Sequence, residues 1–238
     1  MSSLLNIENL VGGYTQKNVL HGISFDVKPN EIVGLIGLNG AGKSTAIKHV
    51  IGLMEPKKGS ISINGKTFQE SPETYRKQFS YIPEMPVLYE ELTLYEHLRE
   101  DVFEKRMEPL LKEFRLEKKL KWFPVHFSKG MRQKVMIMCA FLVQPSLYIV
   151  DEPFVGLDPL GIQSYLTMMN DMKEQGAGVL MSTHILATAE RYCDRFVILH
   201  EGHVRAKGTL EELRESFQMP GATLDDLYVQ LTKEDENV

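Results

Sequence analysis

Short apolar segments alternate along the chain with segments of helical periodicity. Residues 31–36 (EIVGLI), 147–150 and 179–182 are continuous apolar runs, which are typical of strands buried on both faces. Residues 45–51 follow the first run with a helical pattern that ends at Gly52. The alternation predicts a layered α/β fold.

Glycine turns and a long helical stretch divide the rest of the pattern. Ile61 and Ile63 precede Asn64-Gly65, a pair that favours a tight hairpin. Residues 196–199 and 203–207 flank Gly202 and predict a second hairpin. Residues 93–143 are helical in pattern and predict a helical subdomain inserted into the α/β core.

The predicted organisation is one domain in three parts. Residues 1–84 and 145–215 would form the α/β core, and residues 85–144 the helical subdomain. Residues 216–238 would form a C-terminal helix over 224–231 and a tail frayed over 233–238.

Composition excludes several classes of protein. Of the 238 residues, 43% are hydrophobic and 25% charged, the balance of an ordinary globular domain. Cys139 and Cys193 lack metal-spaced partners, which argues against a zinc ribbon or a disulfide framework. The longest apolar run, 135–143, is far short of the roughly 20 residues that cross a bilayer, and the N-terminus shows no secretory signal. The net charge of -5 argues against nucleic acid as a partner.

A phosphate-binding pattern stands between the first predicted strand and helix. Residues 37–45 (GLNGAGKST) fit G-x-x-x-x-G-K-[ST], in which glycines let backbone N–H groups converge on an anion. Lys43 would reach the β- and γ-phosphates, and the Ser44 hydroxyl would ligate Mg²⁺. The pattern predicts a nucleoside triphosphate as ligand. The candidate binding residues are Gly37, Asn39, Gly40, Ala41, Gly42, Lys43, Ser44 and Thr45.

Side chains suited to acid–base chemistry follow two later predicted strands. The apolar run 147–150 leads into Asp151 and Glu152, of which the first is suited to holding Mg²⁺ and the second to activating water. His184 follows the run 179–182, and active sites of parallel sheets gather at such strand ends.

Taken in order, these motifs resemble the ATP-binding subunits of ABC transporters over about residues 4–213. Residues 37–45 resemble Walker A, Asp151 with Glu152 resembles Walker B and its catalytic glutamate, and His184 resembles the switch histidine. Residues 127–131 (FSKGM) stand where the family's L-S-G-G-Q signature belongs. Residues 82–84 (IPE), 127–131 and 180–190 resemble particularly the Ecs-type ATPases of Gram-positive bacteria.

The resemblance implies a P-loop NTPase fold, in which a RecA-like core carries an antiparallel β subdomain and an inserted α-helical subdomain. It also implies ATP and Mg²⁺ as ligands and a catalytic set of Glu152, His184 and Lys43. It implies that two copies sandwich ATP, with each signature completing the other copy's site. It also implies that the two copies lie on the cytoplasmic face of a bacterial membrane, where they contact a separate transmembrane permease. By the same resemblance, adenine would stack on Tyr14, and Asp158 would be the D-loop residue. The signature would consist of Ser128, Lys129, Gly130 and Met131. The metal ligands would be Ser44, Asp151 and Glu84.

The chain departs from the family pattern at a few positions. Glu84 stands where the Q-loop glutamine is usual, and because exporter-type relatives also carry glutamate there, the resemblance favours an exporter. Lys129 replaces the first signature glycine, and either adds charge near the partner's nucleotide or points to solvent. The interval from Glu84 to Ser128 is short for the family, so either the helical subdomain is trimmed or residues are missing near 98–101.

The sequence leaves three alternative functions open. The first is the motor of an exporter. The second is a soluble ABC ATPase acting on nucleic acid or ribosomes, which the single cassette, the lack of a long coiled-coil insertion and the acidic charge disfavour. The third is a regulatory subunit without turnover, against which the intact Lys43, Asp151, Glu152 and His184 count.

Overall fold

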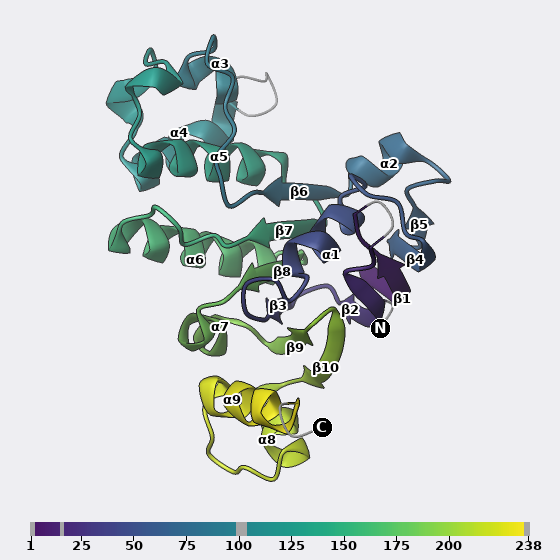
Figure 1. The fold of residues 1–238 in the computed structure, drawn as a ribbon. Coiled ribbons are helices and arrows are strands. Elements are labelled where there is room, and N and C mark those ends of the chain that lie inside the picture. The colour runs from purple at the N-terminus through teal and green to yellow at the C-terminus, as the bar shows by residue number, and fades with distance from the viewer. Residues whose placement is uncertain (1–2, 15–16, 99–103, 236–238) are drawn as a thin grey trace.

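Two β-sheets form the centre of the protein. The computed structural model describes residues 3–14, 17–98 and 104–235 (Figure 1). The larger sheet has the strand order β10-β9-β3-β8-β7-β6, and all its neighbouring strands pair in parallel except β10 with β9. Its strands are β3 (Ile32–Ile36), β6 (Phe79–Ile82), β7 (Leu147–Asp151), β8 (Gly178–Thr183), β9 (Arg195–His200) and β10 (His203–Gly208).

The smaller sheet is antiparallel and has the order β2-β1-β4-β5. It consists of β1 (Leu5–Gly12), β2 (Leu20–Val27), β4 (Lys58–Ile63) and β5 (Lys66–Thr67). Asn64 and Gly65, with φ of +49° and +71°, form the predicted turn between β4 and β5. Helix α1 (Lys43–Val50) buries Ala46, Ile47 and Val50 in one apolar cluster with residues of both sheets.

A second apolar cluster lies on the other face of the larger sheet. Helices α5 (Lys129–Val143) and α6 (Pro159–Glu174) bury residues there together with residues of β7 and β8. Helices α3 (Leu94–Leu98) and α4 (Glu104–Phe114) join this cluster and extend away from the sheet at the top of Figure 1. The chain between α4 and α5 contains two single 3₁₀ turns, Glu117–Lys119 and Pro124–His126.

The C-terminal helices cover the larger sheet around β3 and β9. Helices α7 (Leu186–Tyr192), α8 (Leu210–Ser216) and α9 (Leu224–Asp235) pack on Ile36 of β3 and on Phe196 and Ile198 of β9. They form the lower part of Figure 1. The predicted end of the last helix at Leu231 is wrong, because α9 continues to Asp235 and residues 233–235 are helical rather than frayed. Residues 236–238 lie outside the described residues.

The predicted α/β fold with an inserted helical segment is confirmed. All three buried runs are parallel neighbours in one sheet, and the hairpin around Gly202 joins β9 to β10. The suspected junction at 98–101 lies largely in residues 99–103, outside the described part of the chain. Within the described ranges, no helix combines the length and apolarity that a bilayer span requires.

Short helix α2 (Pro72–Arg76) supplies a buried hydrogen bond to the end of α1. The Tyr75 hydroxyl donates 2.7 Å to the carbonyl oxygen of Val50, and Tyr75 is 1% exposed. We expect Tyr75→Phe to lower the free energy of unfolding by about 1 kcal/mol, because a buried carbonyl loses its partner. Urea unfolding measures this, and an unchanged midpoint would show that the bond contributes no net stability.

Candidate functional site

The loop of residues 37–42 joins β3 to α1 and turns at glycines. Gly40 and Gly42 have φ of +85° and +108°, the left-handed region that glycine adopts at no steric cost. A Cβ on Gly37 would lie 2.4 Å from the carbonyl oxygen of Leu199, because the loop packs directly on β9 there. The glycines at these positions are therefore required by the fold of the loop.

Lys43 begins α1 and turns its amine back into the loop. Its Nζ donates 2.7 Å to the carbonyl oxygen of Gly37 and lies 3.7 Å from Oε1 of Glu152. The residue is only 6% exposed. This geometry places a buried positive charge at the N-terminal end of a helix, where an anion is favoured.

Glu152 lies between two positively ionisable groups. Its Oε1 is 2.9 Å from Nδ1 of His184 and 3.7 Å from the amine of Lys43. Glu152 has φ of +49°, an uncommon conformation for a residue with a side chain. Its backbone N–H donates 3.1 Å to the carbonyl oxygen of Ser182, which holds this turn to the end of β8. The carboxylate is thus aimed into the site from the end of β7.

Sequence reasoning missed Ser182 as a site residue. Ser182 is fully buried, lies opposite Asp151 in the parallel register of β7 and β8, and donates its hydroxyl to Oδ1 of Asp151. This bond fixes the orientation of the Asp151 carboxylate. The only signal was the place of Ser182 at a strand end, two residues before His184.

We expect Ser182→Ala to reduce both stability and turnover. A hydrogen bond to a buried carboxylate contributes about 2 kcal/mol, and without it Asp151 loses its fixed orientation. Urea unfolding and phosphate release measure the two effects. Ser80→Ala, which changes a buried serine on β6, is the matched control. Equal behaviour of the two variants would contradict a special role for Ser182.

A cavity of about 430 Å³ opens beside the loop and α1. It brings together most of the predicted ATP-binding and catalytic residues, and adds Val19 and Leu38, which sequence reasoning did not select. Gly37, Ala41 and Asp151 lie outside the lining, although each adjoins a residue that lines it. The lining residues are Tyr14, Val19, Leu38, Asn39, Gly40, Gly42, Lys43, Ser44, Thr45, Glu84, Glu152 and His184.

Tyr14 and Glu84 contribute to the lining from two separate loops. Tyr14 follows β1, is 50% exposed, and accepts a 2.9 Å hydrogen bond from Lys48, which lowers the pKa of its hydroxyl. Its half-exposed ring is available for stacking with a planar base. Glu84 comes two residues after β6 ends. Burial raises the pKa of nearby Tyr81 to about 12, and the charges of Asp151 and Glu84 add to that shift.

The oxygen donors at this end of the sheet suit Mg²⁺. Ser44 offers a hydroxyl, and Asp151 and Glu84 offer carboxylates, the hard ligands that Mg²⁺ takes in small number together with substrate phosphates. Among the described residues, no cluster of three acidic, histidine or cysteine side chains could hold a metal ion by protein ligands alone. The chemistry of Ser44, Asp151 and Glu84 fits Mg²⁺, which takes few protein ligands when it binds with phosphate.

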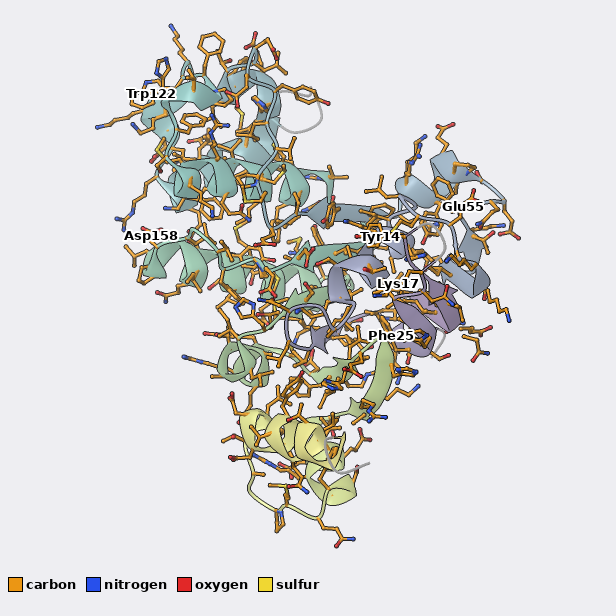
Figure 2. All side chains as sticks on the ribbon, viewed as in Figure 1. Tyr14, Lys17, Phe25, Glu55, Trp122 and Asp158 are labelled. Carbon is orange, nitrogen blue, oxygen red and sulfur yellow. The ribbon has the colours of Figure 1, made fainter. Side chains whose placement is uncertain are left out.

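The signature residues lie outside this cavity. Ser128 caps α5 and accepts a 3.2 Å hydrogen bond from the N–H of Met131, and Lys129 is exposed. Asp158 caps α6, accepts from the N–H of Gly161 at 3.2 Å, and lies 2.9 Å from Nζ of Lys134. The hydrogen bond from Lys134 lowers the pKa of Asp158. Figure 2 shows Asp158 at the outer end of α6, on the opposite side of the view from Tyr14.

The signature and the turn before Asp158 are packed backbone to backbone. A Cβ on Gly130 would lie 2.5 Å from the carbonyl oxygen of Gly156, so only glycine fits there. A Cβ on Gly156 would in turn lie 3.4–3.6 Å from the side-chain carbons of Lys129. The start of α5 and residues 156–158 therefore form one fixed surface, with Lys129 at its exposed edge.

The comparison with protein families matches the ABC transporter family over residues 20–155. Among curated proteins, the chain is 68% identical to the ABC-type transporter ATP-binding protein EcsA of Bacillus subtilis (strain 168), over 98% of each chain. It is 31% identical to the lipopolysaccharide export system ATP-binding protein LptB of Haemophilus influenzae, over 95% of this chain and 99% of LptB.

A solved structure described as the ATP binding subunit of an ABC transporter has a TM-score of 0.94 and 63% identity. The match covers 97% of this chain and all of the other. These likenesses confirm the family that the ordered motifs predicted.

Proposed function

Because the chain belongs to the family of ABC transporter ATP-binding subunits, we propose that it is the motor of an exporter. Members of this family bind ATP and hydrolyse it to power transport, and the chain is an ATPase of this kind. In the proposal, two copies pair around ATP beneath a separate membrane permease, on the cytoplasmic face of a bacterial membrane. The proposed parts are a core of residues 1–84 and 145–215, a helical subdomain of residues 85–144, and a C-terminal part of residues 216–238.

The proposed pairing of two copies is supported by one observation: the candidate signature residues lie apart from the cavity. The cavity holds the phosphate-binding loop, Glu152 and His184, but no signature residue. Ser128 and the first N–H groups of α5 lie outside that cavity, at a helix N-terminus that can bind an anion. A second copy in head-to-tail orientation brings its α5 to this copy's ATP, and a symmetric pair completes both sites.

Each residue of the cavity has a proposed part in phosphoryl transfer to water. Lys43 neutralises phosphate charge, and Glu152 accepts the proton of the attacking water. His184, 2.9 Å from Glu152, contacts the γ-phosphate and orients that carboxylate. Tyr14 stacks on adenine. Ser44, Asp151 and Glu84 would hold Mg²⁺, which would supply charge neutralisation to the phosphates when bound.

Two features support export over other directions or functions. Glu84 stands where the resemblance places the Q-loop residue, a position at which glutamate favours an exporter, and it lines the cavity. LptB, which the chain resembles over nearly its full length, is described as part of an export system. A regulatory subunit without turnover would have no use for the Lys43, Glu152 and His184 arrangement.

Affinity purification of the tagged chain from detergent-solubilised native membranes, followed by mass spectrometry, tests this function. We expect a multi-span membrane protein in near-equal amount. Exposed apolar side chains follow β6, among them Tyr89 at 72% exposure, and they are the proposed permease contact. Tyr89→Asp should lose the partner, whereas Val229→Asp on α9 should retain it. Recovery of ribosomal proteins or nucleic-acid factors instead would contradict the exporter.

A further inference from the structure

The peptide group between Gly37 and Leu38 is hydrogen-bonded on both sides. Its carbonyl oxygen accepts the 2.7 Å bond from Nζ of Lys43. Its N–H donates 3.1 Å to the hydroxyl oxygen of Tyr228, a residue of α9 that lies 190 positions further along the chain. In a trans peptide the two groups point in opposite directions, so Lys43 and Tyr228 hold one plane from opposite sides.

The Tyr228 hydroxyl is held firmly where it meets the loop. Tyr228 is 4% exposed and belongs to the apolar cluster that contains Ile36, the last residue of β3 before the loop. Helix α9 is also tied to α7, because the N–H of Leu224 donates 2.6 Å to Oε2 of Glu190. A hydrogen-bond acceptor on such a fixed ring restrains the loop at little further cost in side-chain entropy.

We propose that Tyr228 is a positioning residue for Lys43, and that α9 is in this way part of the ATP site. By fixing the Gly37–Leu38 peptide, Tyr228 fixes the carbonyl oxygen that receives the Lys43 amine. A donated N–H bond also polarises the peptide and strengthens its carbonyl as an acceptor. The amine is then held where the loop binds phosphate. This inference rests on the proposed role of Lys43 at the phosphates.

Tyr228→Phe tests the inference because it keeps the buried ring and removes only the hydroxyl. We expect the affinity for ATP in the presence of Mg²⁺ to fall about fivefold, the effect of one lost neutral hydrogen bond. Equilibrium binding of ATP to the full-length chain measures this. Tyr75→Phe is the matched control, since it also removes a buried hydroxyl bonded to backbone, but at the far end of α1. It should lower stability and leave ATP affinity unchanged.

A double-mutant cycle with Lys43→Met separates positioning from packing. If Tyr228 acts through Lys43, then Tyr228→Phe weakens ATP binding less in the Lys43→Met chain than in the wild type. Additive effects, wild-type affinity of Tyr228→Phe, or equal losses in both tyrosine variants would overturn the inference while leaving the role of Lys43 intact. Wild-type affinity of Lys43→Met would instead overturn the proposed role of Lys43, and the inference with it.

Discussion

Glu152→Gln should reduce ATP turnover roughly a thousandfold, the range expected for loss of a general base. The amide cannot accept a proton from water, yet it preserves the size of the side chain of a residue that is only 8% exposed. Lys43 and the phosphate-binding loop remain, so ATP binding should persist. With hydrolysis blocked, the two copies should stay paired around ATP. Phosphate release measures the first effect, and size-exclusion chromatography with ATP and Mg²⁺ measures the second.

A matched control distinguishes the base from a general loss of negative charge. Glu73→Gln removes an exposed carboxylate from α2, where Glu73 pairs with Lys77 at 2.6 Å, and it should leave turnover unchanged. Hydrolysis near the wild-type rate in Glu152→Gln would contradict Glu152 as the base. A variant that neither hydrolyses ATP nor pairs would contradict the view that ATP itself joins the copies.

Gly130→Ala should lower turnover by roughly 100-fold, the effect of an ångström-scale misplacement of binding groups. The added Cβ would lie 2.5 Å from the carbonyl oxygen of Gly156, and backbone on both sides must then separate. The start of α5 moves relative to Asp158, so the surface offered to the partner's ATP no longer fits. The cavity of the same chain does not contain Gly130 and should keep its affinity for ATP.

Two measurements on Gly130→Ala make the prediction sharp. Equilibrium ATP binding to the single chain should match the wild type, while ATP-dependent pairing in the Glu152→Gln background should be lost. Pairing at wild-type strength would contradict the proposed place of the signature between copies. A parallel loss of ATP binding would mean that the change disturbs the whole domain.

Residues with a local motif were predictable, and those joined by distant contacts were not. Residues 37–45 carry their own glycine spacing, and the structure places them as a strand–loop–helix unit as expected. Ser182 reaches Asp151 only through the register between β7 and β8. Tyr228 reaches Leu38 across 190 residues, and no pattern in the sequence pairs them. The roles of the motif residues stay predictions until the variants are measured.

Irregular backbone in β1 and β2 explains why the hydrophobic pattern did not identify these two strands. Strand β1 carries Asn9 at φ of +47°, and its register with β2 shifts on both sides of Leu10. Strand β2 contains Gly22 at φ of +82°. Such irregularities break the two-residue alternation from which half-buried strands are recognised. Neither strand was identified from the sequence, although the antiparallel subdomain that contains them was.

The separation of the cavity from the start of α5 has a genetic consequence. If two copies pair as proposed, a copy with a defective signature inactivates the site of the partner that it joins, while its own cavity still depends on that partner's signature. If a cell makes such a copy in equal amount with the normal one, random association leaves about a quarter of the pairs wholly normal. A signature change that blocks hydrolysis without preventing pairing should therefore be dominant over the wild type.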